Sequence, residues 1–237
     1  MKSVTRWLVA AVFAAGALPL AQADQIFQTN PGATNPLTGD LVSGMADFNL
    51  NGSTLTLTLT NTLAGIQSAG QLLTDVFFTL SAPGTPTLTG QTADLITLAS
   101  LGGPKGASIS SNLGSQTLNW GFGAATVNTL NGFELCVICQ GGITSSATPT
   151  EGILGPVSTD GNYDNANASL TNGSHSPFIN DSATFTLSNV PAGATVTNVI
   201  FSFGTTPGGN VSAPEPTSLT ILGVALLAIA GLRRKRA

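Results

Sequence analysis

Threonine and leucine alternate along the sequence STLTLTLTN at residues 53–61. A period of two places successive side chains on opposite faces of a β-strand, so this segment predicts a strand with a buried leucine face and a polar threonine face. The Asn51-Gly52 pair directly before it favours a tight turn, and residues 46–50 offer an antiparallel partner. The pattern therefore predicts a β-hairpin.

Short apolar segments of the same kind recur along the chain, separated by glycine, proline and asparagine. They predict strands at 75–80, 94–99, 117–123, 133–138, 183–189 and 195–204. Between the two termini, no comparable stretch has the helical spacing of apolar residues. This indicates an all-β fold, most simply one antiparallel β-sandwich of jelly-roll or immunoglobulin-like type with about eight to twelve strands.

Two segments lack this alternation. Residues 141–182 are dominated by glycine, asparagine, serine and threonine, which predicts long loops over the sandwich. Residues 205–213, TTPGGNVSA, have the composition of a flexible link.

The first 23 residues have the three parts of a secretory signal peptide. Lys2 and Arg6 form the positive region, an apolar stretch of 14 residues follows, and Ala21 and Ala23 occupy the −3 and −1 positions of a cleavage site. The apolar stretch is short for a membrane span, which takes about 20 residues. We therefore expect signal peptidase to cleave there, so that the mature chain starts at Asp24.

The C-terminus combines an apolar run with a cluster of basic residues. Residues 217–232 carry no charge, and a helix of this length, rising about 1.5 Å per residue, nearly spans the hydrocarbon core of a bilayer. The basic cluster follows directly and consists of Arg233, Arg234, Lys235 and Arg236. Positive charge stays on the cytoplasmic side of a membrane, so we expect the preceding chain outside the cytoplasm.

Pro214, Glu215 and Pro216, followed by this apolar helix and basic tail, resemble the PEP-CTERM sorting signal of bacterial surface proteins. The resemblance implies recognition by a membrane-embedded exosortase, removal of the tail, and delivery to the cell surface or to an exopolysaccharide (biofilm) matrix in Gram-negative bacteria. The prolines also favour an extended peptide that a protease can reach. A permanent single-pass anchor with an incidental Pro-Glu-Pro sequence is the alternative.

The sequence thus divides into four parts. They are a signal peptide at 1–23, a β-sandwich ectodomain at 24–204, a linker at 205–213 and the sorting signal at 214–237. This order predicts an exported precursor, anchored in the inner membrane by its C-terminal helix until it is processed.

Charge is distributed unevenly along the chain. Ten acidic residues lie between Asp24 and Asp181, where Lys105 is the only basic residue. A surface of this sign repels phosphate backbones, which argues against nucleic acid as a partner.

The only two cysteines, Cys136 and Cys139, are three residues apart. A local disulfide is the favoured interpretation in an exported protein, although residues three apart in a straight strand point to opposite faces, so that a bridge requires a tight turn. Free or intermolecular thiols are one alternative. A redox or metal pair is the other, although only His175 and carboxylates could complete a zinc site.

Asp160, Asn162 and Asp164 have the spacing of the first three ligands of a calcium-binding loop. The later positions do not fit, because Asn165 stands in place of the glycine and Thr171 in place of the bidentate glutamate. A solvated turn rich in aspartate and asparagine explains the segment equally well.

Few residues suggest catalysis. His175 is the only histidine, and no G-x-S-x-G nucleophile motif accompanies it. Trp120 could stack on a sugar ring, but core packing is the favoured interpretation. We therefore expect a non-enzymatic surface or matrix protein without a cofactor. The alternatives are a carbohydrate- or calcium-binding adhesin that uses loops 141–182 and, with the least support from the residues, a hydrolase that uses His175 or a carboxylate pair.

Overall fold

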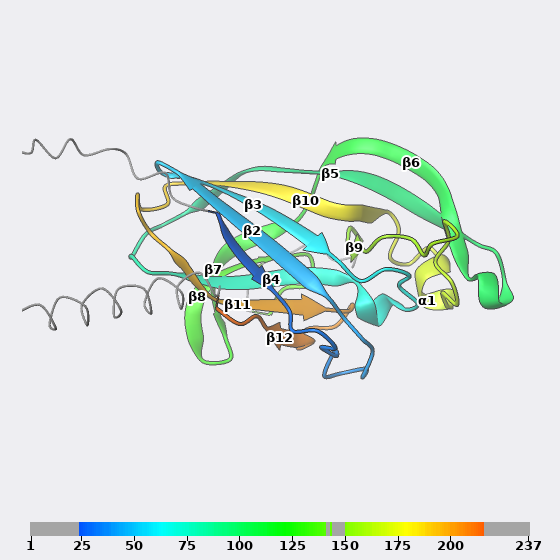
Figure 1. Ribbon diagram of the computed structural model, residues 1–237. Helices are drawn as coiled ribbons and strands as arrows, with labels where there is room; N and C mark the ends of the chain where they lie inside the picture. The colour runs from blue at the N-terminus through cyan, green and yellow to red at the C-terminus, as the bar shows by residue number, and fades with distance from the viewer. Residues whose placement is uncertain (1–23, 141–142, 144–149, 216–237) are drawn as a thin grey trace, which may run out of the picture.

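The computed structural model describes residues 24–140, 143 and 150–215. The predicted signal peptide, Pro216, the predicted membrane helix and the basic tail lie outside these residues. The described chain consists mainly of β-strands (Figure 1), which confirms the all-β prediction. Within the described ranges, the helices are too short or too polar to cross a membrane.

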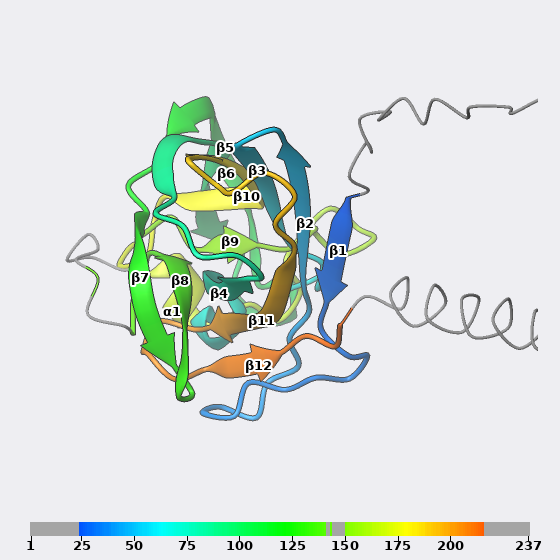
Figure 2. The same ribbon diagram turned by 90° about the vertical axis from the view of Figure 1, so that its left-hand side faces the viewer.

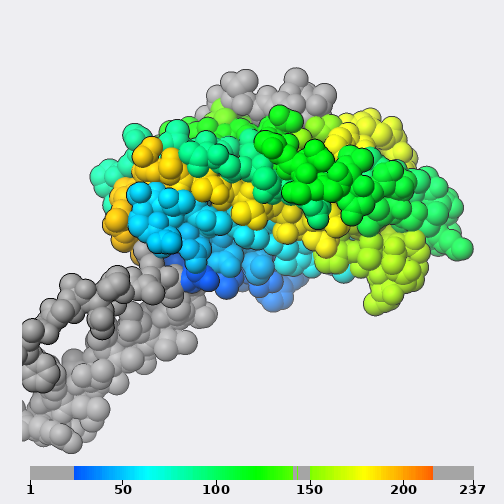
Figure 3. All heavy atoms as spheres, turned by 90° about the horizontal axis from the view of Figure 1, so that it is seen from above, coloured from blue at the N-terminus to red at the C-terminus, as the bar shows by residue number. Residues whose placement is uncertain are grey.

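Twelve strands form one hydrogen-bonded sheet that folds into two layers. The first layer has the strand order β6-β5-β10-β3-β2-β1. Its strands are β1 (Gln25–Gln28), β2 (Gly44–Asn51), β3 (Thr54–Asn61), β5 (Thr87–Ser100), β6 (Ala107–Thr117) and β10 (Phe178–Ser188). Figure 3 shows the outer surface of this layer as neighbouring bands, from blue β2 through cyan β3 and yellow β10 to the green of β5 and β6.

The second layer has the strand order β7-β8-β4-β11-β12. Its strands are β4 (Leu73–Leu80), β7 (Gly121–Val127), β8 (Leu130–Cys136), β11 (Val196–Phe203) and β12 (Asn210–Ser212). The remaining elements are β9 (Ile153–Leu154), η1 (Ala69–Gln71), η2 (Gly103–Lys105) and α1 (Ala168–Thr171). β9 joins the layers, because it pairs with β10 on one side and with β4 on the other (Figure 2).

The predicted hairpin is confirmed in β2 and β3. The two strands pair antiparallel from the turn outward, beginning with Asn51 opposite Thr54. Leu55, Leu57 and Leu59 are buried, and the threonines between them are half-buried on the other face. Alternation in the sequence therefore corresponds directly to the two faces of this strand.

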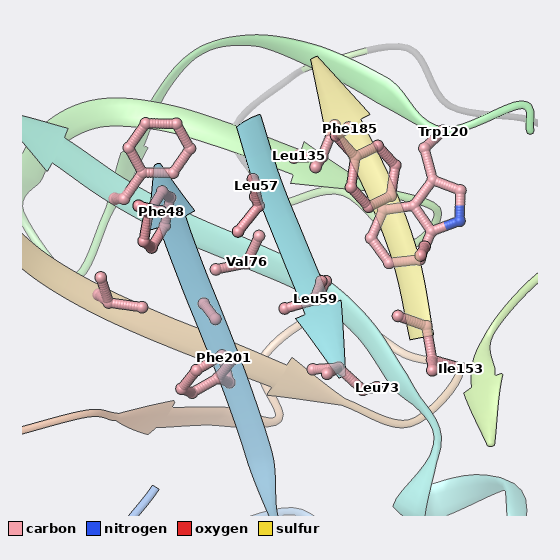
Figure 4. Close-up of a cluster of buried hydrophobic side chains, with 14 of the residues drawn as sticks. Phe48, Leu57, Leu59, Leu73, Val76, Trp120, Leu135, Ile153, Phe185 and Phe201 are labelled. Atoms are coloured by element: carbon pink, nitrogen blue, oxygen red, sulfur yellow. The ribbon is translucent and has the colours of Figure 1, made fainter. Parts of the chain in front are cut away.

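The main core lies between the two layers. Phe48 and Leu57 of the first layer point toward Val76 and Phe201 of the second (Figure 4), and all four are buried. The rings of Phe48 and Phe78 are 5.2 Å apart across this core. Burying each such side chain contributes about 1.5–3 kcal/mol, so each layer is stabilised by the other.

The sheet is mixed rather than purely antiparallel. β9 runs parallel to β10, with Ile153 opposite Ile179, while the other strand pairs are antiparallel. β9 occupies the side of β10 where β3 has ended, since the β3 pairing of β10 begins only at Ser182. The predicted antiparallel arrangement therefore holds for every strand pair except this one.

The prediction of one continuous strand at 117–123 is wrong. β6 ends at Thr117 and β7 begins at Gly121. Between them the backbone N–H of Leu118 donates to the carbonyl of Gln91, and that of Trp120 to the Gln91 side chain. Both apolar side chains are buried, so the chain turns inward here instead of continuing as a strand.

The segments predicted as irregular contain regular structure. Residues 150–182 include β9, α1 and the start of β10. In residues 205–213, predicted as a flexible link, β12 pairs with β11. The composition is polar and rich in glycine, but backbone pairing with strands distant in sequence fixes both segments.

Candidate functional site: the sorting segment and its attachment

The chain between β12 and Glu215 lies on β11. After the pairing of Ser212 with Ile200, the N–H of Ala213 donates to the carbonyl of Val199 at 2.8 Å. Pro214 and Glu215 are exposed, and Oε1 of Glu215 accepts a hydrogen bond from the backbone N–H of Asn198 at 3.1 Å. The predicted Pro-Glu-Pro motif therefore starts on the sandwich itself.

A row of polar side chains crosses the second layer close to this attachment. Strand register places Asp75 of β4 opposite Ser202 of β11, and Ser202 opposite Asn210 of β12. Glu134 of β8 lies diagonally across from Asp75, because its direct partner is Phe77. Since Val76 and Phe201 point into the core, alternation puts this polar row on the opposite face of the layer.

Gln140 covers the polar row. Its Nε2 lies 3.1 Å from Oδ2 of Asp75, 2.8 Å from Oγ of Ser202 and 2.6 Å from Oδ1 of Asn210. Its Oε1 accepts from Nδ2 of Asn210 at 2.9 Å, so the two amides are paired in both directions. The backbone N–H of Gln140 donates to Oε1 of Glu134 at 2.7 Å.

A disulfide places Gln140 over the row. Cys136 and Cys139 are bonded, with their Cα atoms 5.1 Å apart. The structure therefore has the local disulfide that the sequence favoured for these two cysteines. The bridge makes the chain reverse directly after β8, which brings Gln140 back over Glu134.

Two carboxyl groups lie buried in this network. Asp75 and Glu134 are both fully buried and within hydrogen-bonding reach of each other. Burial, followed by the charge of Glu134, raises the pKa of Asp75 well above its ordinary value. Asp75 is thereby favoured as a carboxylic acid, which can donate a proton to its neighbour.

The residues with calcium-loop spacing form a turn. Oδ1 of Asp160 accepts from the backbone N–H of Asn162 at 3.0 Å, and Oδ2 accepts from the Asn162 side chain at 3.0 Å. These hydrogen bonds lower the pKa of Asp160. In the part of the chain that the structure describes, no group of three or more histidine, cysteine, aspartate or glutamate side chains is arranged to hold a metal ion. Asp164 is half-buried beside the buried Tyr163, whose hydroxyl donates to the carbonyl of Gly155.

His175 lines a hollow of about 330 Å³ together with Asp40, Ser68 and Ser169. Four segments that are distant in sequence meet there, at 35–40, 68–70, 169–175 and 203–206, which the sequence did not indicate. The Ser68 hydroxyl donates to Asp40 at 2.8 Å, and the Ser169 hydroxyl donates to Asn167 at 2.6 Å. Neither hydroxyl is thus available to donate to the imidazole, as a serine nucleophile would.

Trp120 belongs to the core. It is 3% exposed, its ring lies 5.2 Å from that of Phe185, and its Nε1 donates to the carbonyl of Glu151. It therefore presents no face to a sugar.

Sequence reasoning missed the polar network around Gln140. A signal was available, since Asp75 interrupts the apolar segment LLTDVFFTL and Glu134 interrupts FELCVI. A charged residue inside a strand that is otherwise apolar indicates either an exposed face or a buried network. Sequence alone cannot separate these cases, because the partners come from four different strands and a loop.

No curated protein and no solved structure matches this chain. Residues 212–235 match the family model described as the PEP-CTERM protein-sorting motif. This match begins at Ser212, the last residue of β12, and includes Pro214 and Glu215. It ends at Lys235, so it covers the basic cluster except Arg236. The chain therefore carries the PEP-CTERM sorting motif that exosortases process, which makes it an exported, surface-directed protein.

Proposed function

We propose that this protein is a non-enzymatic component of the cell surface or extracellular matrix that is processed at both ends. One observation carries the proposal: the sorting motif begins at Ser212, where the last strand of the β-sandwich ends. Cleavage just beyond this strand would release the sandwich as a complete folded unit.

The proposed route has three steps. Signal peptidase removes residues 1–23 during export. The apolar segment 217–232 then holds the precursor in the inner membrane, with the basic residues on the cytoplasmic side. The exosortase cuts near Pro214–Pro216, and the domain is delivered to the surface or to an exopolysaccharide matrix.

The character of the domain supports an extracellular role. The half-buried and exposed threonines of β3 give this strand an uncharged outer face, and Lys105 is the only lysine or arginine in residues 24–215. Such a surface offers few charged groups for nonspecific attraction.

Intact-mass measurement of protein extracted from the cell surface tests this proposal. We expect a chain that starts at Asp24 and lacks the residues after the Pro214–Pro216 region. A surface protein whose mass includes residues up to Ala237 would contradict exosortase processing.

Two variants sharpen this test. Glu215→Ala, or replacement of Arg233–Arg236 by serine, should trap the membrane-bound precursor, which is detected as a larger species on immunoblots. Asp94→Ala is the matched control, because it removes an exposed carboxylate on β5, away from the motif. If the Glu215→Ala chain is processed normally, the exosortase does not recognise the Glu215 side chain.

The hollow beside His175 supports a second candidate function, binding of a saccharide. Its polar side chains supply hydroxyls, a carboxylate and an imidazole, which are groups that bind sugar hydroxyls. A glycan array compares the wild type with His175→Ala and Asp40→Asn. Equal binding by all three proteins, or binding by none, would exclude the hollow as a sugar site.

A further inference from the structure

We propose that β12 is a latch that limits access of the exosortase to the sorting segment, and that the Cys136–Cys139 disulfide holds this latch closed through Gln140. The inference rests on the proposed function, since it concerns when the same segment becomes available for cleavage. The folded domain would thus control when the exosortase can reach the sorting segment, which the enzyme recognises at the membrane.

The segment to be cut is docked in the folded state. Ser212 pairs with β11, the N–H of Ala213 is hydrogen-bonded to Val199, and the Glu215 carboxylate accepts from Asn198. A protease binds its substrate as an extended peptide whose backbone groups are free to pair with the enzyme. The N–H of Ala213 and the Glu215 carboxylate become free when this part of the chain separates from β11.

β12 is a short edge strand, and Val211 and the following Ala213 pack against the rim of the main core. It has three residues, pairs only with β11, and its Val211 is only half-buried. The amide pair between Asn210 and Gln140 adds a side-chain attachment to this backbone pairing. Asn210 also accepts from the Ser202 hydroxyl at 2.6 Å.

The position of Gln140 depends on the disulfide. The bridge joins Cys136, the last residue of β8, to Cys139. Cys139 is thereby fixed to the end of this strand, and Gln140 is the next residue. Without the bridge, the segment gains conformational freedom that must be lost again when the amide pair forms. The latch is therefore held closed in the disulfide-bonded form that the structure has.

Opening of β12 by local unfolding then sets the cleavage rate. When opening and closing are fast relative to cleavage, proteolysis follows the population of the open state. Weakening the latch should therefore accelerate processing, although it removes no residue of the sorting motif.

Hydrogen exchange of the full-length chain in detergent measures the latch without the exosortase. Asn210→Ala and Gln140→Ala should each accelerate exchange in residues 210–215 about tenfold, because each removes both hydrogen bonds of the amide pair. Leu57→Val is the matched control, since it weakens the core on β3 and leaves the latch intact. Unchanged exchange in Asn210→Ala, or equal acceleration in the control, would overturn the latch.

A double-mutant cycle tests the role of the disulfide. Cys136→Ser/Cys139→Ser should accelerate exchange of residues 210–215 as Asn210→Ala does. Adding Asn210→Ala to the cysteine variant should then have little further effect, because the amide pair is already loosened. Fully additive effects would show that the disulfide does not act through Gln140.

A pulse-chase experiment with the exosortase tests the consequence for processing. We expect Asn210→Ala to be cut about tenfold faster than the wild type and Leu57→Val to be cut at nearly the wild-type rate. If exchange accelerates but cleavage does not, the latch proposal is wrong and exosortase sorting stands. A wild-type chain that is never cut would overturn the proposed function, and this inference with it.

Discussion

Asp75 carries the most unusual environment of any single residue described above. It is a fully buried acid on β4 that lies against a second buried acid, Glu134, and under the amide of Gln140. This environment favours the protonated form of Asp75 in the folded chain. Its pKa is raised first by burial and then by the charge of Glu134.

This shift makes folding stability depend on pH. Because the pKa of Asp75 is higher in the folded than in the unfolded chain, the folded state binds more protons. The contribution of Asp75 is fully present below its ordinary pKa of 3.8 and is lost as pH rises through the folded value. The loss is at most about 1.4 kcal/mol per pH unit in that window.

We predict that Asp75→Asn removes this part of the pH dependence. The asparagine carbonyl can accept from Gln140, and its NH₂ can donate to Glu134 in place of the acidic proton. Melting temperatures measured between pH 4 and 9 should fall less steeply with rising pH in the variant than in the wild type. Parallel curves would mean that Asp75 is ionised in the folded state.

At the scale of elements, the two-residue strand β9 depends on one side chain. Nδ2 of Asn61, at the end of β3, donates to the carbonyls of Gln71 and Ile153 at 2.9 Å each. Oδ1 of the same residue accepts from the N–H of Leu63. Asn61 is fully buried, so this amide replaces the backbone pairing that β3 can no longer offer.

We predict that Asn61→Ala loosens the junction between the layers. The variant leaves two buried carbonyls and an amide without their partner, which costs about 3 kcal/mol. Hydrogen exchange at Ile153 and Leu154 should accelerate more than exchange in the β7–β8 hairpin. Asn49→Ala, which removes an exposed amide bonded to Asp24, is the control and should leave both regions unchanged.

The sequence predicts elements with a regular apolar face and misses those without one. β3 was predicted almost to the residue because its leucines alternate and are buried. β6 was missed because only Ile109 and Leu113 are large and apolar, and both are exposed on this edge strand. β12 was missed because three residues in a glycine-rich segment show no period, and only β11 makes them a strand.

The same limit applies to the candidate site. The sorting motif was predicted within two residues of its matched bounds, 212–235, because its order of proline, acid, apolar run and basic cluster is local in the sequence. The network that holds it was not predicted, because Asp75, Ser202 and Asn210 meet only through strand register. Local chemistry can be predicted from sequence, whereas long-range register requires the fold.

At the scale of the molecule, the core that spans both layers predicts a single cooperative unit. Leu57→Ala should lower the free energy of unfolding by about 2–5 kcal/mol and the melting temperature by about 5–15 °C. Calorimetry should show one transition in both proteins. Two separate transitions in the variant would show that the layers unfold independently.

The position of Lys105 has a consequence for the lifetime of the protein outside the cell. Trypsin-like proteases cut after lysine and arginine, and this residue would be their only target once both terminal signals are gone. It lies exposed in η2, between the paired strands β5 and β6. A cut there would leave the two fragments joined by the β5–β6 ladder, so the mature domain should remain assembled even after digestion.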